Sequence, residues 1–309
     1  MKHILNYNIT ELKEKLAIIC QKQFRVNQVL LWIFKRYTID FEKMTNISKE
    51  NQILLSNNFS NELPKVLDVK KSVDGTTKFL ISLSDDAVIE MVYMPSEKKT
   101  SLCISTQVGC MKGCVFCATA RLGLLRNISQ DELLAQIFLT YQYFPNKRIT
   151  NLVLMGMGEP LDNFENIISF LDIVQSNEGL SFSGRRITIS TCGVVPRIYQ
   201  LADLRIKVKL AVSLNSAINE ERNKIMPINL KYNLNELKAS LLYFRKKTNF
   251  RITFEYVMIA NFNMNKADII ALKKFCGDIS CKLNLIKWNE VQYLDWKAPN
   301  DEEINSFIE

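Results

Sequence analysis

The sequence predicts an α/β protein whose main part is an incomplete parallel βα barrel of about six units. From residue 101 onward, short apolar segments alternate with segments of helical periodicity. The short segments are continuously apolar, which is typical of parallel strands that are covered on both faces. Earlier in the chain the pattern is first helical and then strand-like. We therefore expect a helical accessory domain at residues 1–60, a β meander and linker at 61–98, and the partial barrel at 99–309.

The composition is that of a globular protein. Of the 309 residues, 47% are hydrophobic and 23% are charged, which suits a packed core. No apolar run approaches the roughly 18–20 residues of a membrane span, and the first residues lack the apolar region of a signal peptide. We expect a cytoplasmic protein without a membrane segment.

The charged and reactive residues narrow the function classes. A net charge of +8 favours a polyanionic partner, with nucleic acid first. Because His3 is the only histidine, a Ser-His-Asp triad elsewhere is excluded and a His-ligated catalytic zinc is disfavoured. The eight cysteines are clustered, and in a reducing compartment this pattern favours metal binding or catalysis over disulfides.

The first sixty residues contain three segments of helical periodicity, at 9–21, 25–37 and 48–59. Their predicted apolar faces consist of Leu12, Leu16, Ile19 and Cys20, then Val29, Leu30, Ile33 and Phe34, then Ile53 and Leu54. Each basic residue on the outer faces is interpreted singly as solvated surface. As a set they are candidates for phosphate contacts: Lys13, Lys15, Lys22, Arg25, Lys35 and Arg36.

Residues 65–94 predict an antiparallel meander with strands at 65–73, 77–83 and 87–94. In the third strand, Ile89, Met91 and Tyr93 share one face, and Glu90 lies on the other. Glu90 is either an exposed charge on an edge strand or a carboxylate that faces a polar ligand. The residues alone leave both interpretations open.

The barrel strands are expected at 102–107, 149–155, 185–190, 208–214, 252–258 and 282–288. Helices are expected between and after them, at 130–143, 165–175, 196–202, 219–224, 234–246, 266–277 and 301–309. Ser129 with Glu132 predicts a capping box, and Asn233 with Glu236 is a similar helix start.

Unusual residues follow the carboxyl ends of these strands, where parallel α/β folds bind their ligands. Each group alone is ordinary turn chemistry, but five groups at one end of the strands predict a site. They are the cysteine loop after the first strand, Gly156–Pro160, Ser190–Gly193, Ser213–Asn215 and Trp288–Asn289.

The cysteine loop reads C-x3-C-x2-C at Cys110, Cys114 and Cys117, with Cys103 seven residues upstream. Four thiolates on a structural zinc are one interpretation. However, Cys103 lies in a strand-like run, and only one of the two C-x2-C knuckles of a typical zinc site is present. Three thiolates on a four-iron cluster fit better, and they leave one iron open for another ligand.

In these motifs the chain resembles the radical S-adenosylmethionine (SAM) superfamily and, more closely, the RlmN/Cfr family of RNA adenine methyltransferases. The resemblance extends from about residue 10 to the end of the chain. The matching segments are Val92–Pro95, Leu102–Cys110, Phe116–Thr119, Arg126–Asn127, Met155–Pro160, Ser190–Pro196, Ser213–Asn215, Met226–Asn229, Phe254–Met258 and Asn284–Asn289.

The resemblance implies two cofactors, a 4Fe-4S cluster and SAM. Cys110, Cys114 and Cys117 would hold the cluster, whose open iron would chelate the amino and carboxylate groups of SAM. Gly158 and Glu159 would contact the SAM amino group. The rest of the SAM pocket would consist of Ser190, Ser213, Leu214, Asn215 and Asn289.

The resemblance also implies the catalytic residues and partners. Glu90 would be the carboxylate near the target adenine, and Cys103 the thiol that resolves a covalent enzyme–RNA adduct. The substrate would be a ring carbon, carbon 2, of an adenine in ribosomal RNA, with transfer RNA as a second substrate. An electron donor such as flavodoxin or ferredoxin and a monomeric chain are the other expectations.

One element of the family pattern is missing. The family uses a further cysteine, in an Ala-Cys-Gly-Gln-Leu segment, to carry a methyl group taken from SAM, and the 309 residues contain no such segment. None of the other cysteines is a convincing substitute: Cys20, Cys192, Cys276 and Cys281. We therefore expect a truncated member of the family that is inactive as it stands. The alternatives are a carrier supplied by another chain, an enzyme that cleaves SAM for another outcome, and a non-catalytic RNA-binding or zinc-stabilised remnant.

Overall fold

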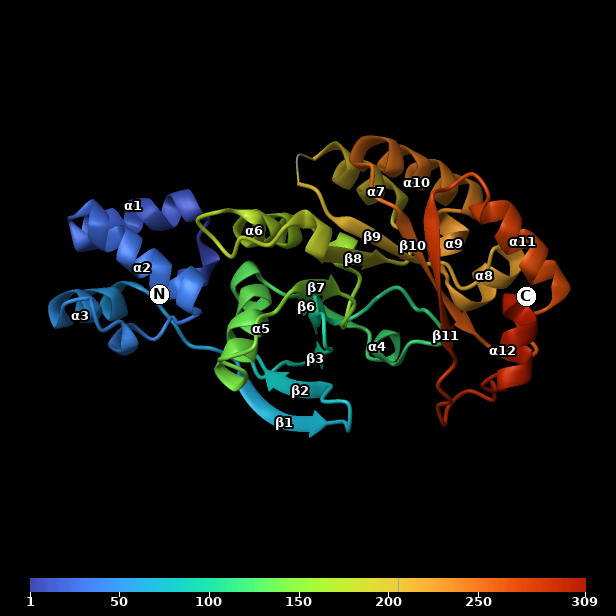
Figure 1. The fold of residues 1–309 in the computed structure, drawn as a ribbon, viewed down its shortest axis with the longest axis horizontal. Helices are drawn as coiled ribbons and strands as arrows, with labels where there is room; N and C mark the ends of the chain where they lie inside the picture. Colours follow the sequence, from blue (N-terminus) through green and yellow to red (C-terminus); the bar gives the residue numbers. More distant parts are fainter. Residues whose placement is uncertain (205) are drawn as a thin grey trace. The chain divides into compact units, whose positions relative to one another are not determined.

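The computed structural model describes residues 1–204 and 206–309. The chain forms two compact units, each assembled from separate stretches of sequence (Figure 1). Unit 1 consists of Met1–Val108, Arg126–Met157 and Asn163–Ile187. Unit 2 consists of Gly109–Leu125, Gly158–Asp162 and Thr188–Glu309.

Unit 1 begins with three helices, as predicted: α1 (Ile9–Cys20), α2 (Gln23–Arg36) and α3 (Lys49–Asn58). The predicted buried face of α3 is wrong, since Ile53 and Leu54 are 60% and 38% exposed while Gln52 and Leu55 are buried. The Gln52 amide donates to the carbonyls of Met44 and Ile47, at 3.0 and 3.3 Å. These bonds fix the rotation of the helix, because a buried amide must find hydrogen-bond partners.

Two lysines tie these helices to a later part of unit 1. The Lys35 ammonium of α2 donates to the carbonyls of Asn177 and Gly179 and to the Ser181 hydroxyl, at 3.0, 2.7 and 2.7 Å. Lys13 of α1 forms an ion pair with Glu178. Both lysines therefore have local structural partners, although Lys35 remains exposed and Lys13 is half-buried.

The predicted meander is confirmed as β1 (Lys65–Lys71), β2 (Thr77–Ser82) and β3 (Val88–Pro95). The strands pair antiparallel in that order, and the other edge of β3 pairs antiparallel with β4 (Thr100–Cys103). β4 then pairs in parallel with β7 (Asn151–Leu154). Because β3 has neighbours on both edges, Glu90 does not lie on an edge strand.

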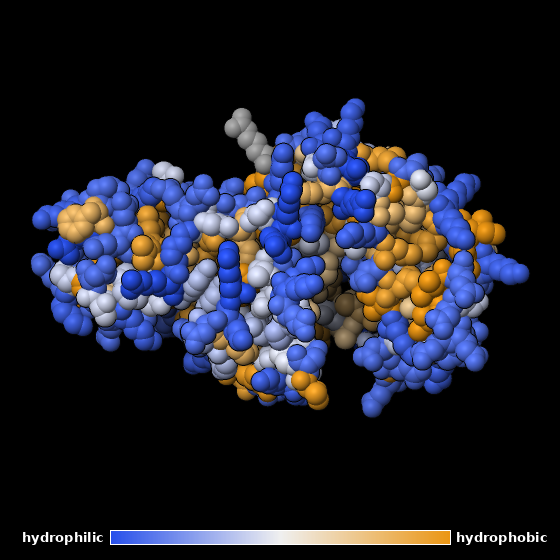
Figure 2. All heavy atoms as spheres, in the orientation of Figure 1, coloured by the Kyte–Doolittle hydropathy of each residue, from blue (hydrophilic) through white to orange (hydrophobic). Residues whose placement is uncertain are grey.

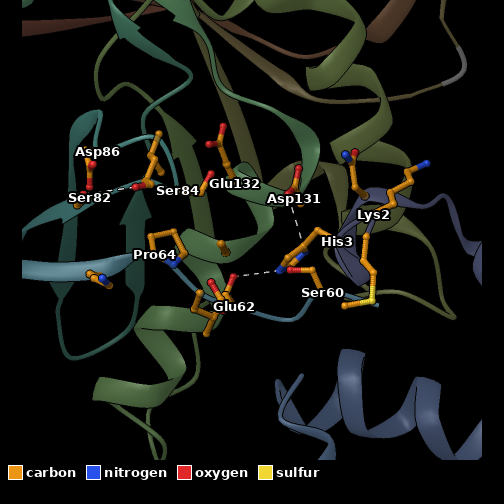
Figure 3. Close-up of a pocket in the computed structure, with 16 residues that line it drawn as sticks. Lys2, His3, Ser60, Glu62, Pro64, Ser82, Ser84, Asp86, Asp131 and Glu132 are labelled. Atoms are coloured by element: carbon orange, nitrogen blue, oxygen red, sulfur yellow. Dashed lines mark hydrogen bonds and ion pairs between the residues drawn. The ribbon is translucent and has the colours of Figure 1, made fainter. Parts of the chain in front are cut away.

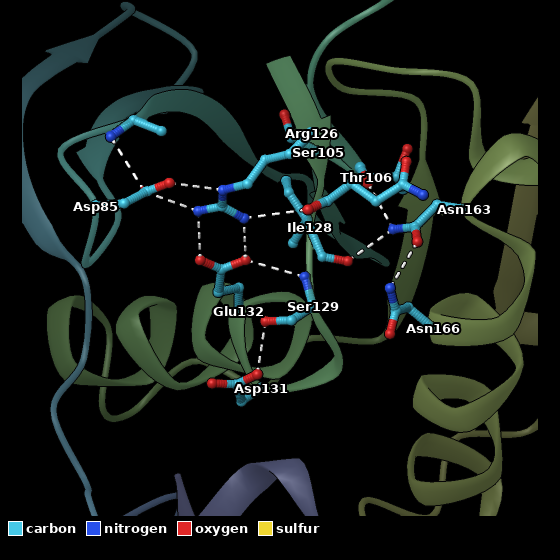
Figure 4. Close-up of polar contacts among 12 residues, drawn as sticks. Asp85, Ser105, Thr106, Arg126, Ile128, Ser129, Asp131, Glu132, Asn163 and Asn166 are labelled. Carbon is cyan, nitrogen blue, oxygen red and sulfur yellow. Dashed lines mark hydrogen bonds and ion pairs between the residues drawn. The ribbon is translucent and has the colours of Figure 1, made fainter. Parts of the chain in front are cut away.

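The predicted strand at 102–107 is divided in the structure. β4 ends at Cys103, and β5 (Gln107–Gly109) forms a two-stranded sheet with β6 (Leu124–Asn127). In β6, the Arg126 guanidinium lies between two carboxylates, Asp85 at 2.7 Å and Glu132 at 2.8 Å (Figure 4). The hydrogen bonds from Arg126 hold the pKa of Asp85 down at about 2.

Two long helices complete unit 1, α5 (Gln130–Tyr143) and α6 (Phe164–Gln175). The predicted capping box of Ser129 and Glu132 is present at the start of α5. Near its middle, the buried Gln136 side chain accepts a hydrogen bond from the Ser105 N–H and donates one to the Ser105 carbonyl, at 2.9 and 3.0 Å. A helix side chain thus takes the place of a neighbouring strand beside Ser105.

Unit 2 contains parallel strands in the order β8 (Ile187–Thr191), β9 (Lys209–Ser213), β10 (Ile252–Met258) and β11 (Cys281–Lys287). β8 begins with Ile187, the last residue of unit 1. The helices that accompany them are α4 (Ala118–Arg121), α7 (Val195–Asp203), α8 (Asn219–Ile225), α9 (Ile228–Lys231), α10 (Leu234–Thr248), α11 (Lys266–Cys276) and α12 (Asp301–Ile308). The capping box of Asn233 and Glu236 begins α10, as predicted.

The α/β fold class is confirmed, with parallel strands after the helices and meander. The parallel strands were expected to be covered on both faces. This expectation is wrong for β11, in which Leu283 and Ile286 are 39% and 40% exposed. Apolar surface is visible over the region of β10 and β11 (Figure 2). Within the described residues, no helix combines the length and apolar composition that a membrane crossing requires.

Candidate functional site

The three cysteines of the C-x3-C-x2-C motif lie in a tightly closed loop of unit 2. At its start Gly109 has φ +78°, and its backbone lies against that of Gly123. The Cys110 N–H donates to the Gly123 carbonyl at 2.7 Å, and the Cys117 N–H donates to the Cys114 carbonyl at 3.0 Å. A glycine is required at residue 109, since a β-carbon there would overlap the Gly123 carbonyl oxygen. The backbone therefore brings the three cysteines to one short loop.

The three thiols influence one another. Burial raises the pKa of Cys114 to about 12, and the neighbouring charges of Cys117 and Cys110 act in the same direction. Burial also raises the pKa of Cys110, which is 8% exposed. Across residues 1–204 and 206–309, no three His, Cys, Asp or Glu side chains are already spaced to hold a metal ion. Three neighbouring thiols on a glycine-bent loop nevertheless fit the thiolate donor set of an iron–sulfur cluster.

Glu159 is a buried carboxylate in unit 2, only 3% exposed. Its Oε1 accepts a hydrogen bond from the Leu161 N–H at 3.0 Å, and its Oε2 accepts one from the Cys192 N–H at 2.8 Å. Burial raises the pKa of the Glu159 carboxyl despite these bonds. The side chains of Cys192 and Thr191 also form hydrogen bonds with this carboxylate. Gly158 beside it has φ +103°.

The predicted residues after β8 and β9 come from neighbouring strands. Ser190 pairs with Ala211 in the register of the two strands, which places it two residues before the level of Ser213. Leu214 and Asn215 follow β9 and are buried. Asn215 has φ +56°, and its Oδ1 accepts a hydrogen bond from the Val257 N–H at 2.9 Å. Its side chain thus holds the chain after β9 against β10.

Asn289 differs from Leu214 and Asn215 in its exposure to solvent. It follows β11 and is exposed, whereas the preceding Trp288 is buried. The Trp288 N–H donates to the Met258 carbonyl at 3.1 Å, which extends the pairing of β10 and β11 by one residue. Unit 2 therefore contains every residue predicted for the cluster and for SAM: the cysteine loop, the Gly158–Asp162 segment, and the residues at the carboxyl ends of β8, β9 and β11.

Glu90 and Cys103 belong to unit 1. Cys103 is the last residue of β4, between Val92 of β3 and Val153 of β7. Burial raises the pKa of the Cys103 thiol to about 11, although the Met155 N–H partly offsets it. The Glu90 carboxylate forms an ion pair with Lys78 at 2.9 Å, and the two side chains are 44% and 45% exposed.

Sequence reasoning missed the contribution of Ser105. Its hydroxyl donates to the Glu90 carbonyl at 2.6 Å and accepts from the Met157 N–H at 2.8 Å. This fully buried serine therefore fixes the main chain of the strand that carries Glu90. Nearby, Asn163 donates to the carbonyls of Thr106 and Ile128 (Figure 4). The only sequence signal is a polar Ser-Thr pair that directly follows an apolar strand.

A separate polar cavity of about 450 Å³ lies in unit 1 and contains none of the predicted site residues. Its walls include His3, whose ring is hydrogen-bonded to the Glu62 carbonyl and lies 3.8 Å from Asp131 (Figure 3). Burial lowers the pKa of His3. The single histidine is thus part of the packing of the N-terminal segment.

Comparisons with known proteins assign the class. Residues 104–273, just over half of the chain, match the model of the radical SAM superfamily. Residues 2–60 match the model described as the ribosomal RNA large subunit methyltransferase N-terminal domain. The radical SAM fold and the cysteine loop of unit 2 are therefore parts of one recognised class of enzymes, which use a 4Fe-4S cluster and SAM.

Whole-chain relatives narrow the class to a family. The chain is 41% identical to a probable dual-specificity RNA methyltransferase RlmN of Clostridium perfringens, over 100% of this chain and 89% of that protein. A Flavobacterium psychrophilum protein of the same description is 42% identical over 96% and 87%. A crystal structure of a radical SAM methyltransferase from Sphaerobacter thermophilus superposes with a TM-score of 0.94 and 34% identity, over 99% of this chain and 91% of that one. The chain belongs to the RlmN family of radical SAM RNA methyltransferases.

Proposed function

We propose that this protein methylates carbon 2 of an adenine in ribosomal RNA and also acts on transfer RNA. The observation that carries the proposal is the cysteine loop of unit 2, in a chain that matches named RNA methyltransferases over its whole length. When bound, the cluster and SAM supply the radical chemistry that an unreactive ring carbon needs. The protein's own residues bind, orient and exchange protons.

In this proposal Cys110, Cys114 and Cys117 hold the cluster, and the end of the strands in unit 2 holds SAM. Gly158 and Glu159 contact the SAM amino group. The two hydrogen bonds that Glu159 accepts from the Leu161 and Cys192 N–H groups keep the carboxylate in one orientation. The pocket is completed by Ser190, Ser213, Leu214, Asn215 and Asn289.

Cys103 and Glu90 are the proposed catalytic residues. Because burial raises the pKa of Cys103 to about 11, its sulfur holds a proton at neutral pH and requires a proton acceptor before it can act as a nucleophile. The Glu90 carboxylate is an acceptor that contacts the adenine once Lys78 releases it. Ser105 holds the Glu90 main chain during that change.

The partners follow from the same proposal. Residues 1–60 form an RNA-contacting domain, joined through the meander and linker of 61–98 to the partial barrel of 99–309. Lys15, Lys22 and Arg36 are exposed and Arg25 is half-buried, so their charges are available to phosphates. A flavodoxin or ferredoxin supplies electrons to a monomer in the cytoplasm, a compartment that keeps the eight free cysteines reduced.

An anaerobic assay tests the proposal. The protein is reconstituted with iron and sulfide, then mixed with SAM, a reductant and RNA. Methylated adenosine in digested RNA and deoxyadenosine from SAM are measured by mass spectrometry. We expect about four irons per chain and both products, with iron and products lost in Cys114→Ala. Zinc without iron contradicts the cofactor assignment.

A second candidate is a chain that cleaves SAM for another outcome, because residues 104–273 match the model of the whole radical SAM superfamily. The same assay separates the two, because deoxyadenosine without methylated RNA supports the second candidate. The expected inactivity gains no support from the comparisons, whose relatives are described as RNA methyltransferases.

A further inference from the structure

Arg222 of α8 is fully buried, with none of its surface exposed. Its Nε donates to the Leu214 carbonyl at 3.0 Å, and its Nη1 donates to the Asn229 Oδ1 at 2.9 Å. Its Nη2 donates to the carbonyls of Cys192 and Ser213, at 2.7 and 3.1 Å. Within the described residues, all four of these bonds end on neutral oxygens.

This arrangement satisfies the guanidinium as a donor but does not neutralise its charge. Desolvating a cation is costly unless an anion balances it, and carbonyl dipoles only partly replace water. Burial lowers the pKa of Arg222 to about 10, which still leaves the side chain charged at neutral pH. The buried positive charge of Arg222 is therefore not balanced by these partners, and a nearby anion would stabilise it.

The position of Arg222 indicates which anion. Its carbonyl partners belong to residues at the ends of β8 and β9, where the SAM site is proposed. The cysteine loop contacts the helix of Arg222, because the Val115 N–H donates to the Ile225 carbonyl of α8 at 3.0 Å. The thiols of Cys114 and Cys192 are the titratable groups nearest in effect to the guanidinium. Asn229 is in turn held by the Oδ1 atoms of Asn219 and Asn223, at 3.1 and 2.6 Å. The guanidinium is thus fixed beside the cysteine loop.

A neighbouring cation shows the contrast. Lys112, inside the cysteine motif, forms an ion pair with Asp162 at 2.8 Å. Its charge is therefore already balanced by a carboxylate. Arg222 differs because its neighbours are thiols, which become anions only when they ligate a metal.

We propose that Arg222 is the positive charge that balances the thiolates of Cys110, Cys114 and Cys117 when they hold the iron–sulfur cluster. The inference rests on the proposed function, because it requires the cluster ligands assigned there. A nearby cation stabilises the one-electron-reduced cluster, which carries one more negative charge than the oxidised form. Arg222 thus acts on the cluster through its charge, without ligating it, and makes the cluster easier to reduce.

The reduction potential of the reconstituted protein tests this role without RNA or SAM. Wild type, Arg222→Gln, Arg222→Lys and Arg126→Gln are titrated anaerobically with dithionite, and the reduced cluster is followed by electron paramagnetic resonance. We expect Arg222→Gln to shift the midpoint to a more negative potential. Arg222→Lys keeps the positive charge and should have a midpoint close to that of the wild type. Arg126→Gln removes a different guanidinium, in unit 1, and should leave the midpoint unchanged.

The other possible outcomes decide whether Arg222 has this role. An unchanged midpoint in iron-loaded Arg222→Gln shows that Arg222 is only a scaffold. Iron loss in both Arg222→Gln and Arg222→Lys, with lower melting temperatures of the iron-free forms, leads to the same conclusion. Iron loss in Arg222→Gln alone, with a wild-type midpoint in Arg222→Lys, supports the role. Failure of the wild type to take up iron contradicts the proposed function as well, and that distinguishes the two failures.

Discussion

Gly109 shows at the scale of a single residue how the cysteine loop depends on backbone approach. Gly109→Ala places a β-carbon on the Gly123 carbonyl oxygen at φ +78°. We expect a loss of more than about 2 kcal/mol in unfolding free energy and poor iron uptake. Urea unfolding and iron analysis after reconstitution measure both effects.

Gly123→Ala is the matched control, because Gly123 has a similar φ of +68° but no atom lies within 4 Å of the added carbon. Its cost should be about 1–2 kcal/mol, and iron uptake should stay near wild type. Equal losses of iron in both variants would show that close packing at residue 109 is not what closes the loop.

Asp268 of α11 provides a residue-scale prediction of pH dependence. Burial, followed by the neighbouring Glu221 carboxyl, raises the pKa of Asp268 to about 7. The folded state then binds more protons than the unfolded state between about pH 4 and pH 7, so the stability of the fold decreases as the pH rises through this range. Asp268→Asn should reduce the difference in melting temperature between pH 5 and pH 8.

Asp278→Asn is the control for this experiment. Asp278 is an exposed carboxylate, and its ion pair with Lys238 lowers the pKa of Asp278. It stays ionised in both states above pH 5 and should leave the wild-type difference unchanged. The prediction fails if Asp268→Asn retains that full difference.

Residues also mark the limit of sequence reasoning. The cysteine motif could be recognised because its thiols are close in the chain and their chemistry is specific. Ser105 and Arg222 could not be predicted, since their partners are mostly main-chain carbonyls and amides of distant segments. The type of a residue does not predict hydrogen bonds to the main chain of distant segments.

Among the elements, the Lys35 contacts are the clearest link between the N-terminal helices and a later segment. Lys35→Met removes three hydrogen bonds to residues 177–181. We expect faster hydrogen exchange at residues 177–183 and a loss of about 1–2 kcal/mol in stability. Lys15→Met, on an exposed face of α1, should change neither. Unchanged exchange in Lys35→Met would show that α2 does not hold this segment.

Element boundaries were predictable wherever their signals are local. Capping boxes and long apolar periods located α5 and α10 to within two residues of their observed bounds. β5, β6 and α4 were missed because three or four residues carry no measurable period, and β5 and β6 depend on the closure of the cysteine loop. The face of α3 was missed because Gln52 is buried through its hydrogen bonds.

For the molecule as a whole, cofactor binding should act unequally on the two units. A group that binds only the folded state stabilises the unit that holds it. Iron–sulfur reconstitution should slow hydrogen exchange in Gly109–Leu125 and Gly158–Asp162 of unit 2, while residues 1–60 of unit 1 keep their rates. Cys114→Ala should show no change on treatment with iron. Equal protection of both units would contradict the assignment of the cluster to unit 2.

If Glu90 has the proposed catalytic role, the strength of its ion pair with Lys78 limits how much binding energy a substrate loses in separating the two. Both side chains are nearly half exposed, and such pairs stabilise a fold by no more than about 1 kcal/mol. Releasing Glu90 therefore lowers the affinity for a ligand by at most about fivefold. The main chain beneath it stays fixed by Ser105, so the carboxylate can change partner without any rearrangement of its strand.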